Sequence, residues 1–467
     1  MHTADGVLVR ETCVLSPNAG EAPCGTAAKE AVDVITRLTP LMGPFPRQTL
    51  ALVPVHAGAW PRIARNLPGE IRGSETVFRF AGSGDLTPEV LVRGIAEQWL
   101  LFKPGLIQRR DAWLVHALPT YLAVRYLSEV NPQAAQAVVA RALRDAPMEG
   151  TARALAEGDP EPRDAATLMP AQRGMMVLRT LETAIDRERV DRALPEMMRR
   201  AAGRPPTTEM LESACEEIAG RKLAWFFDYF IAGTKIPAIE FRRVPSESAG
   251  VVAGEIVVKE FVSGGSLRVE MVVRTAAGVV EHSVATHGTV TPFTVNVPAT
   301  ATGITVDPDL RILRWTDAAR RSQAQDAILA TIPKYASEAE RAAAYRRAIA
   351  ADPDDASRRA QSLNKELGEM EAGNDRHDGA LAAWDAAVNG HSIAPFETYF
   401  VRANALLCRG KSLAIWGRFA EAREDVRAGM GLPAAVLVQT ADVNWKPPAK
   451  TLREELQEVL KRTAKPK

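Results

Sequence analysis

The spacing of hydrophobic positions changes twice along the chain. Between Thr26 and about residue 235, apolar residues recur mostly every three or four positions, and this pattern predicts amphipathic helices. Two apolar runs within this part, Thr49–Val55 and Val77–Phe80, predict buried strands. From Ala238 to Leu313 the period is two and is broken by Gly-Gly, Ala-Gly and Thr-Pro pairs, which predicts a β-sandwich of about seven strands.

The helical period returns at about Thr316, in an alanine-rich region with three weak repeats. The repeated positions are Tyr345, Ala348 and Pro353, then Ala380, Trp384 and Ala387, then Gly410, Gly417, Phe419 and Ala422. They are similar to tetratricopeptide repeats, although Ala348 and Ala387 are 39 residues apart and the usual period is about 34. Stacked helix pairs of this kind bind peptides or proteins on a concave surface. A plain helical domain is the alternative.

These patterns predict a multidomain α+β protein with four segments. Residues 1–25 are polar and rich in turn residues, and we expect an N-terminal tail or remnant. Residues 26–235 form a mostly helical domain, 236–315 a β-sandwich, and 316–467 an α-helical repeat domain.

Composition narrows the possible functions. The chain has 467 residues, of which 46% are hydrophobic and 25% charged, values typical of globular proteins. A net charge of +1 gives no electrostatic reason to expect binding to nucleic acid or to an anionic membrane. No apolar run approaches the roughly 20 residues of a membrane helix, and the N-terminus lacks the features of a secretory signal. The sequence leaves the compartment open.

The four cysteines are too scattered for a disulfide framework. They are Cys13, Cys24, Cys215 and Cys408. Cys13 and Cys24 could pair in an oxidising compartment, and free thiols are the alternative.

Two predicted helices carry the residues of greatest chemical interest. Thr87-Pro88-Glu89 provides a capping hydroxyl, a proline at the first helical position and an acid in the first turn. The helix that follows contains Arg93-Gly94-Ile95-Ala96-Glu97 and then Gln98-Trp99. A second helix opens at Asp111 and carries His116, with eighteen residues between Glu97 and His116. Pro119 removes a backbone donor from this helix and predicts a kink.

This frame resembles the zinc peptidases of the aminopeptidase N family. Their first helix carries His-Glu-x-x-His followed by Gln-Trp, and a glutamate eighteen residues further on completes the zinc ligands. The resemblance covers roughly residues 26–315 and also includes Trp113-Leu114, Arg173-Gly174 and Phe226-Phe227. It implies a thermolysin-like catalytic domain, a β-sandwich and aminopeptidase activity. Family members also carry an N-terminal β-domain, so the chain would be a truncated version or would begin with the tail of that domain.

The residues at the family's reactive positions have changed. Arg93 stands at the first ligand position, and a guanidinium has no lone pair to donate to a metal. Gly94 stands at the position of the catalytic base, Glu97 at the second ligand and His116 at the third. Since Arg93 and Glu97 are one helical turn apart, we expect them to form an ordinary ion pair.

Two further family motifs have lost their functional side chains. Gly58-Ala59 resembles the start of Gly-Ala-Met-Glu-Asn, but Pro61 replaces the glutamate that binds the substrate amine and Arg62 replaces the asparagine. Ala171 replaces the tyrosine that stabilises the oxyanion. Any substrate cleft would lie near Gly58, Ala59 and Arg62.

We therefore expect a catalytically inactive homologue without a cofactor, which binds peptides or proteins or acts as a scaffold. The alternative is an active metallo-aminopeptidase in which zinc is held by Glu97, His116 and a further residue such as His56. A third possibility makes the helical repeats the working part and the peptidase-like fold a spacer.

Overall fold

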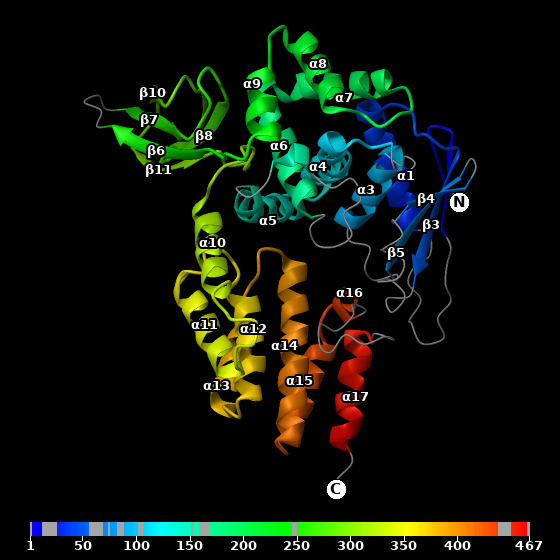
Figure 1. Cartoon of the computed structure of the whole chain (residues 1–467), viewed down its shortest axis with the longest axis vertical. Helices are drawn as coiled ribbons and strands as arrows, with labels where there is room; N and C mark the ends of the chain where they lie inside the picture. Colours follow the sequence, from blue (N-terminus) through cyan, green and yellow to red (C-terminus); the bar gives the residue numbers. More distant parts are fainter. Residues whose placement is uncertain are drawn as a thin grey trace.

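The computed structural model describes residues 2–11, 26–55, 69–72, 75–81, 88–100, 106–150, 154–157, 168–244, 250–437 and 450–464. Figure 1 shows a sheet and a group of helices at the upper right, a β unit at the upper left and a column of helices below. No helix in these ranges is both long and apolar enough to cross a membrane.

A five-stranded sheet lies at the N-terminal side of the molecule. Its order is β1-β2-β3-β5-β4, with β1 at His2–Ala4, β2 at Val7–Glu11, β3 at Thr49–Val55, β4 at Gly69–Arg72 and β5 at Glu75–Ala81. The three central strands are parallel, and each edge strand is antiparallel to its neighbour. Strand β3, which the apolar run predicts, lies at the centre with Leu50 and Leu52 fully buried.

Residues 2–11 form strands of this sheet, in the segment where we expected an N-terminal tail or remnant. Strand β2 pairs with β3 from Leu8 to Glu11. Val7 and Val9 are buried in the main hydrophobic core. This burial favours the strand over a solvated tail, because apolar side chains removed from water stabilise the fold.

The helices that follow pack on the sheet and on one another. They are α1 (Thr26–Met42), α3 (Pro88–Glu97), α4 (Ala112–Val130), α5 (Pro132–Gly150), α6 (Leu168–Ile185), α7 (Arg187–Ala201), α8 (Thr208–Ala219) and α9 (Ala224–Phe227). Short helical turns cover Gln98–Leu100, Arg109–Asp111, Leu155–Glu157 and Asp228–Ala232. Helix α4 contacts α3, α5 and α6, which explains why nearly all its residues are buried. It continues without a break through Pro119.

Six strands form the β unit in the described residues, where we expected about seven. They are β6 (Ala238–Val244), β7 (Val251–Lys259), β8 (Arg268–Thr275), β9 (Gly278–Ala285), β10 (Val290–Asn296) and β11 (Ala301–Val306), arranged as sheets β10-β7-β6 and β11-β8-β9. Strand β11 ends at Val306, because the next residue, Asp307, has a φ of 50° that is incompatible with an extended strand. The Asp307 carboxylate instead accepts the backbone N–H groups of Arg311 and Ile312.

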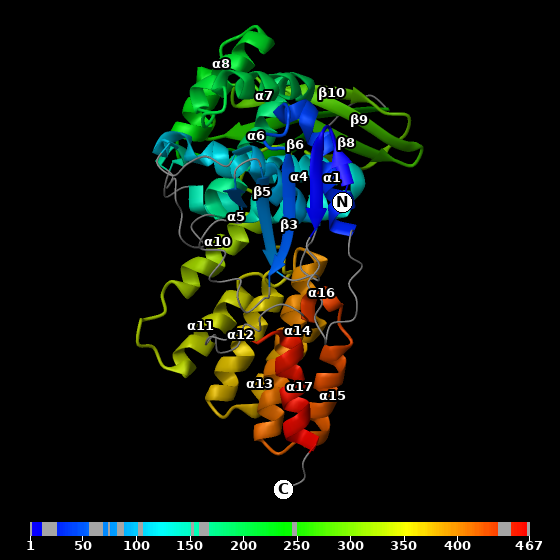
Figure 2. The same ribbon diagram turned by 90° about the vertical axis from the view of Figure 1, so that its right-hand side faces the viewer.

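The C-terminal part is entirely helical within the described residues (Figure 2). It contains α10 (Asp317–Leu329), α11 (Glu338–Ala350), α12 (Ala360–Gly373), α13 (His377–Asn389), α14 (Pro395–Ile415), α15 (Phe419–Met430), α16 (Ala434–Leu437) and α17 (Leu452–Ala464). Consecutive helices pack as hairpins, most extensively α12 with α13 and α14 with α15. In the first hairpin Gly368 lies directly against Trp384, and in the second Gly429 lies against Leu456 of α17.

Candidate functional site

The exposed side of α3 carries an ion pair. One face of the helix is buried in the core through Leu91, Val92, Ile95 and Ala96. Arg93 and Glu97 lie on the other side, with side chains 36% and 29% exposed. The Arg93 Nε and a Glu97 carboxylate oxygen are 3.8 Å apart, so the ion pair expected from the spacing is confirmed.

The electrostatic environment of Glu97 is set mainly by burial. Desolvation raises the pKa of the Glu97 carboxyl above its ordinary value, and the Arg93 guanidinium opposes this shift. At 3.8 Å the two groups attract one another without a short hydrogen bond. A partly exposed pair of this kind contributes roughly 0–1 kcal/mol to stability.

Trp99 attaches the end of α3 to the turn after α1, while Gln98 forms a hydrogen bond within its own helix. The Gln98 side-chain amide donates a hydrogen bond of 2.7 Å to the carbonyl of the buried Gly94. The Trp99 indole donates to the Gly43 carbonyl at 3.1 Å, and its ring meets Phe45 edge-on at a centroid distance of 4.7 Å. This Gln-Trp pair therefore has a structural role that is independent of any reaction at Glu97.

His116 lies half-buried on α4, the helix that packs against α3. The start of α4 is tied to α8, because the Trp113 indole donates to the Thr208 hydroxyl at 3.0 Å. The Asp111 carboxylate accepts the Thr208 backbone N–H at 2.8 Å and makes no capping bond to α4 itself. The residue that marks the helix start in the sequence therefore also joins two helices.

Helix α6 carries Ala171 on the face that packs against α4. A Cβ built on Gly174 would meet the Cβ of Ala117 at 2.5 Å, so α6 and α4 approach one another very closely at this point. Ala171 precedes Gly174 by three residues and therefore shares its helix face. Ala171 is half-buried, and its methyl group offers no hydrogen-bond donor.

The described residues contain no group of three or more His, Cys, Asp or Glu side chains arranged to hold a metal ion. The two potential ligands at the family positions are the Glu97 carboxylate and the His116 imidazole. His56, which could complete a set, lies outside the described residues, as do Gly58, Ala59, Pro61 and Arg62.

A buried polar network further along α4 could not be found from the sequence. On α4, Arg125 binds the Asp191 carboxylate through two hydrogen bonds of 2.6 and 2.9 Å and donates to the Tyr121 hydroxyl at 2.8 Å. Tyr121 donates to Glu182 at 2.6 Å, and burial raises the pKa of its hydroxyl. The spacing of Tyr121 and Arg125 indicates one helix face, but their acidic partners belong to α6 and α7.

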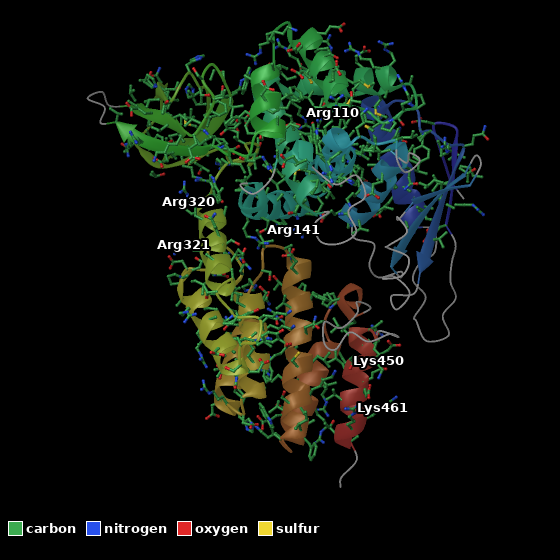
Figure 3. All side chains as sticks on the ribbon, in the orientation of Figure 1. Arg110, Arg141, Arg320, Arg321, Lys450 and Lys461 are labelled. Carbon is green, nitrogen blue, oxygen red and sulfur yellow. The ribbon has the colours of Figure 1, made fainter. Side chains whose placement is uncertain are left out.

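Arg141 connects the frame to the C-terminal helices (Figure 3). From α5 it donates to Glu397 in the first turn of α14 at 2.6 Å and to Glu89 in the first turn of α3 at 3.2 Å. These contacts hold the start of the helix that carries Arg93 and Glu97 beside the start of α14. The helical column is thus attached to the frame through a partly buried guanidinium.

Comparisons with known proteins agree with this arrangement at the level of the fold. No family model and no curated protein matches the chain. Among solved structures, it is similar to Legionella pneumophila aminopeptidase A in complex with aspartic acid, with a TM-score of 0.51 and 11% sequence identity. The match covers 94% of this chain and 58% of that protein, so the chain spans little more than half its length. The chain therefore has a multidomain α+β fold that is distantly aminopeptidase-like.

Proposed function

We propose that this protein is a catalytically inactive relative of the zinc aminopeptidases that binds peptides or proteins and acts as a scaffold. The observation that carries the proposal is the ion pair between Arg93 and Glu97. At the position of the first metal ligand stands a permanent cation, which has no lone pair and repels a divalent ion. At the second, the carboxylate is already engaged by that cation.

The residues that remain do not fit a catalytic zinc ion. Such a site typically has three protein ligands and an open position for water. Here Glu97 and His116 supply two potential ligands, and Arg93 brings a positive charge to within 3.8 Å of one of them. We therefore propose that the protein works without a metal cofactor.

Two further losses support an inactive site. Gly94 has no side chain to act as a base, and it is buried on α3. Ala171 on α6 has no hydroxyl to stabilise an oxyanion, and loss of one such donor typically lowers the rate by about 10²–10³. Because these losses affect different parts of the reaction and lie on separate helices, no single replacement would restore activity.

The C-terminal helices support the binding role. Hairpins α12–α13 and α14–α15 pack in succession, as helical repeats do. A Cβ on Gly368 would lie 2.4 Å from the Trp384 indole nitrogen, so the small residue lets the two helices of one hairpin touch. We propose that these hairpins form an irregular tetratricopeptide-like array and present a surface for extended peptides.

The catalytic part of the proposal is tested by zinc analysis and by assay with fluorogenic aminoacyl amides. We expect substoichiometric zinc and no release of N-terminal residues. Stoichiometric zinc that is lost in His116→Ala, together with chelator-sensitive release, would establish the rearranged metallo-aminopeptidase instead. His282→Ala is the matched control, because His282 is also half-buried but lies on strand β9.

The binding part is tested with a fluorescent pool of short peptides titrated against the full chain. We expect saturable binding that a chelator leaves unchanged and that persists in Glu97→Ala. If the chelator abolishes binding, the metal-dependent alternative gains support. If no peptide in the pool binds, the binding role is wrong even where the absence of activity holds.

A further inference from the structure

A pocket of about 440 Å³ lies at the end of α3 that is remote from Glu89. Gln98 and Trp99 form one side, the turn after α1 from Gly43 to Arg47 forms another, and the end of α7 with Gly203 and Arg204 forms the third. Its volume falls within the roughly 300–1,000 Å³ of small-molecule sites. The pocket is therefore large enough for a ligand of modest size.

The lining combines apolar surface with arginine. The apolar side chains are mainly Met42, Trp99, Pro195 and Met198, and the arginines are Arg47, Arg199 and Arg204. Among the described residues, none of those that line the pocket is acidic. An anionic ligand would therefore meet positive charge without a competing carboxylate in the lining.

The three arginines differ in whether an acidic side chain already pairs with their positive charge. Arg199 is neutralised by Glu196, which accepts two hydrogen bonds of 2.7 Å from its guanidinium. Within the described ranges, Arg47 and Arg204 form no ion pair. Arg47 donates to the Pro46 carbonyl at 2.8 Å, and its buried Nε has no hydrogen-bond partner there. Arg47 and Arg204 can therefore still bind an anion.

This pocket adjoins the aminopeptidase-like frame at Gln98 and Trp99, but Arg93, Glu97 and His116 are not among the residues that line it. Glu89 in the first turn of α3 faces Arg141, whereas the pocket begins after Glu97, and a helix of this length spans about 15 Å. Helices α1 and α7 lie side by side at the upper end of the molecule, away from the C-terminal column (Figures 1 and 2). Because Arg93 does not line the pocket, a ligand here would not need to displace the Arg93–Glu97 ion pair.

We propose that this pocket binds a small amphipathic anion, with a carboxylate or phosphate group against Arg47 and Arg204 and an apolar body against Trp99 and Met198. The guanidinium fork matches both anionic groups through paired hydrogen bonds. The apolar lining contributes by removing hydrocarbon from water. The proposal is independent of the proposed function, because it uses neither the Arg93–Glu97 pair nor the C-terminal hairpins.

The test uses octanoate, octyl phosphate and octanol as probes on the full chain, with binding measured by calorimetry. We expect saturable binding of at least one anion and much weaker binding of octanol. A preference for octanoate identifies a carboxylate ligand, and a preference for octyl phosphate identifies a phosphate ligand. Octanol binding as strong as that of both anions, or no binding of either anion, would overturn the proposal.

Variants place the binding in this pocket. Arg47→Gln with Arg204→Gln should weaken anion binding about tenfold or more, because charge-assisted hydrogen bonds are lost. Arg242→Gln with Arg243→Gln, on strand β6, removes the same charge elsewhere and should leave affinity unchanged. Equal affinity in the two double variants contradicts the assignment. Met198→Glu, which adds a carboxylate beside the pocket, should also weaken binding and serves if the first variant does not fold.

Discussion

Gly174 on α6 lies so close to Ala117 on α4 that a Cβ on the glycine would be 2.5 Å from the alanine Cβ. The same atom would be 3.1 Å from the ring of Trp113. Real Cβ atoms do not approach one another this closely, so the crossing of the two helices requires a residue without a side chain. Gly174 is one of the residues that carry the resemblance to the aminopeptidases. In this structure, helix packing explains why a glycine is needed at this position.

Gly174→Ala should lower the free energy of unfolding by about 1–3 kcal/mol, the usual cost of overpacking. Alanine favours the helix over glycine by about 1 kcal/mol. The variant should therefore be less stable even though its helix propensity is higher. Urea denaturation followed by circular dichroism measures the change.

Gly373→Ala is the matched control, because Gly373 is also helical and its added Cβ would meet no atom closer than 3.8 Å. We expect this control to be neutral or slightly stabilising. If both variants unfold at the same urea concentration as the unmodified chain, α4 and α6 do not cross as closely as the structure places them.

The free energy of unfolding of Glu97→Gln, relative to that of the unmodified chain, should increase as pH rises. Burial raises the pKa of Glu97, so the folded chain holds this proton above the ordinary value of 4.5, where the unfolded chain has lost it. Stability from the neutral carboxyl is therefore complete below 4.5 and is lost as pH rises through the folded pKa. The difference in unfolding free energy between variant and parent, measured at pH 4 and pH 7, should be larger at pH 7.

Glu196→Gln should show the opposite pH dependence. Hydrogen bonds from Arg199 and Arg200 lower the pKa of Glu196 to about 2. The stability that its charge contributes is present above the ordinary value of 4.5 and is lost as pH falls toward 2. The loss of unfolding free energy in Glu196→Gln, relative to the unmodified chain, should therefore become smaller as pH falls. Parallel pH profiles for the two variants would contradict the raised pKa of Glu97.

The triple change Arg93→His, Glu97→His and His116→Glu should create a zinc site. It places two imidazoles on one face of α3 at a spacing of four residues and a carboxylate on α4, which gives the usual three ligands. Calorimetry with zinc should show one tight site in the triple variant. The variant with only Arg93→His and Glu97→His should bind more weakly, and equal affinity in both would mean that position 116 does not face α3.

Local patterns in the sequence predict the helices and strands well. The helical spacing that begins at Thr26 corresponds to a helix from Thr26 to Met42, and the strand expected at Thr49–Val55 has these bounds in the structure. The Arg93–Glu97 pair is predictable for the same reason, since residues four apart on a helix are neighbours whatever surrounds them. These features depend only on the geometry of a single element.

Features that join distant segments could not be predicted. Strand β1 has three residues, and β2 finds its parallel partner β3 about forty residues later, so the local pattern of residues 2–11 resembles a tail. The anion pocket combines the end of α1, the end of α3 and the end of α7. Each segment by itself contains only an arginine or a tryptophan beside a turn, and the cavity exists only after the helices pack.

The contact between Arg141 and Glu397 should hold the C-terminal helices on the frame. Their side chains are 24% and 31% exposed, so the pair is screened less than a surface pair. A double-mutant cycle with Arg141→Ala and Glu397→Ala should give a coupling energy of roughly 0.5–3 kcal/mol. The control is the pair Arg418–Glu421 at the start of α15, whose side chains are 40% and 50% exposed. Its coupling energy should be about 0.5 kcal/mol or less. Because Arg141 also binds Glu89, equal couplings in the two cycles would show that α14 and α3 are held together by other contacts.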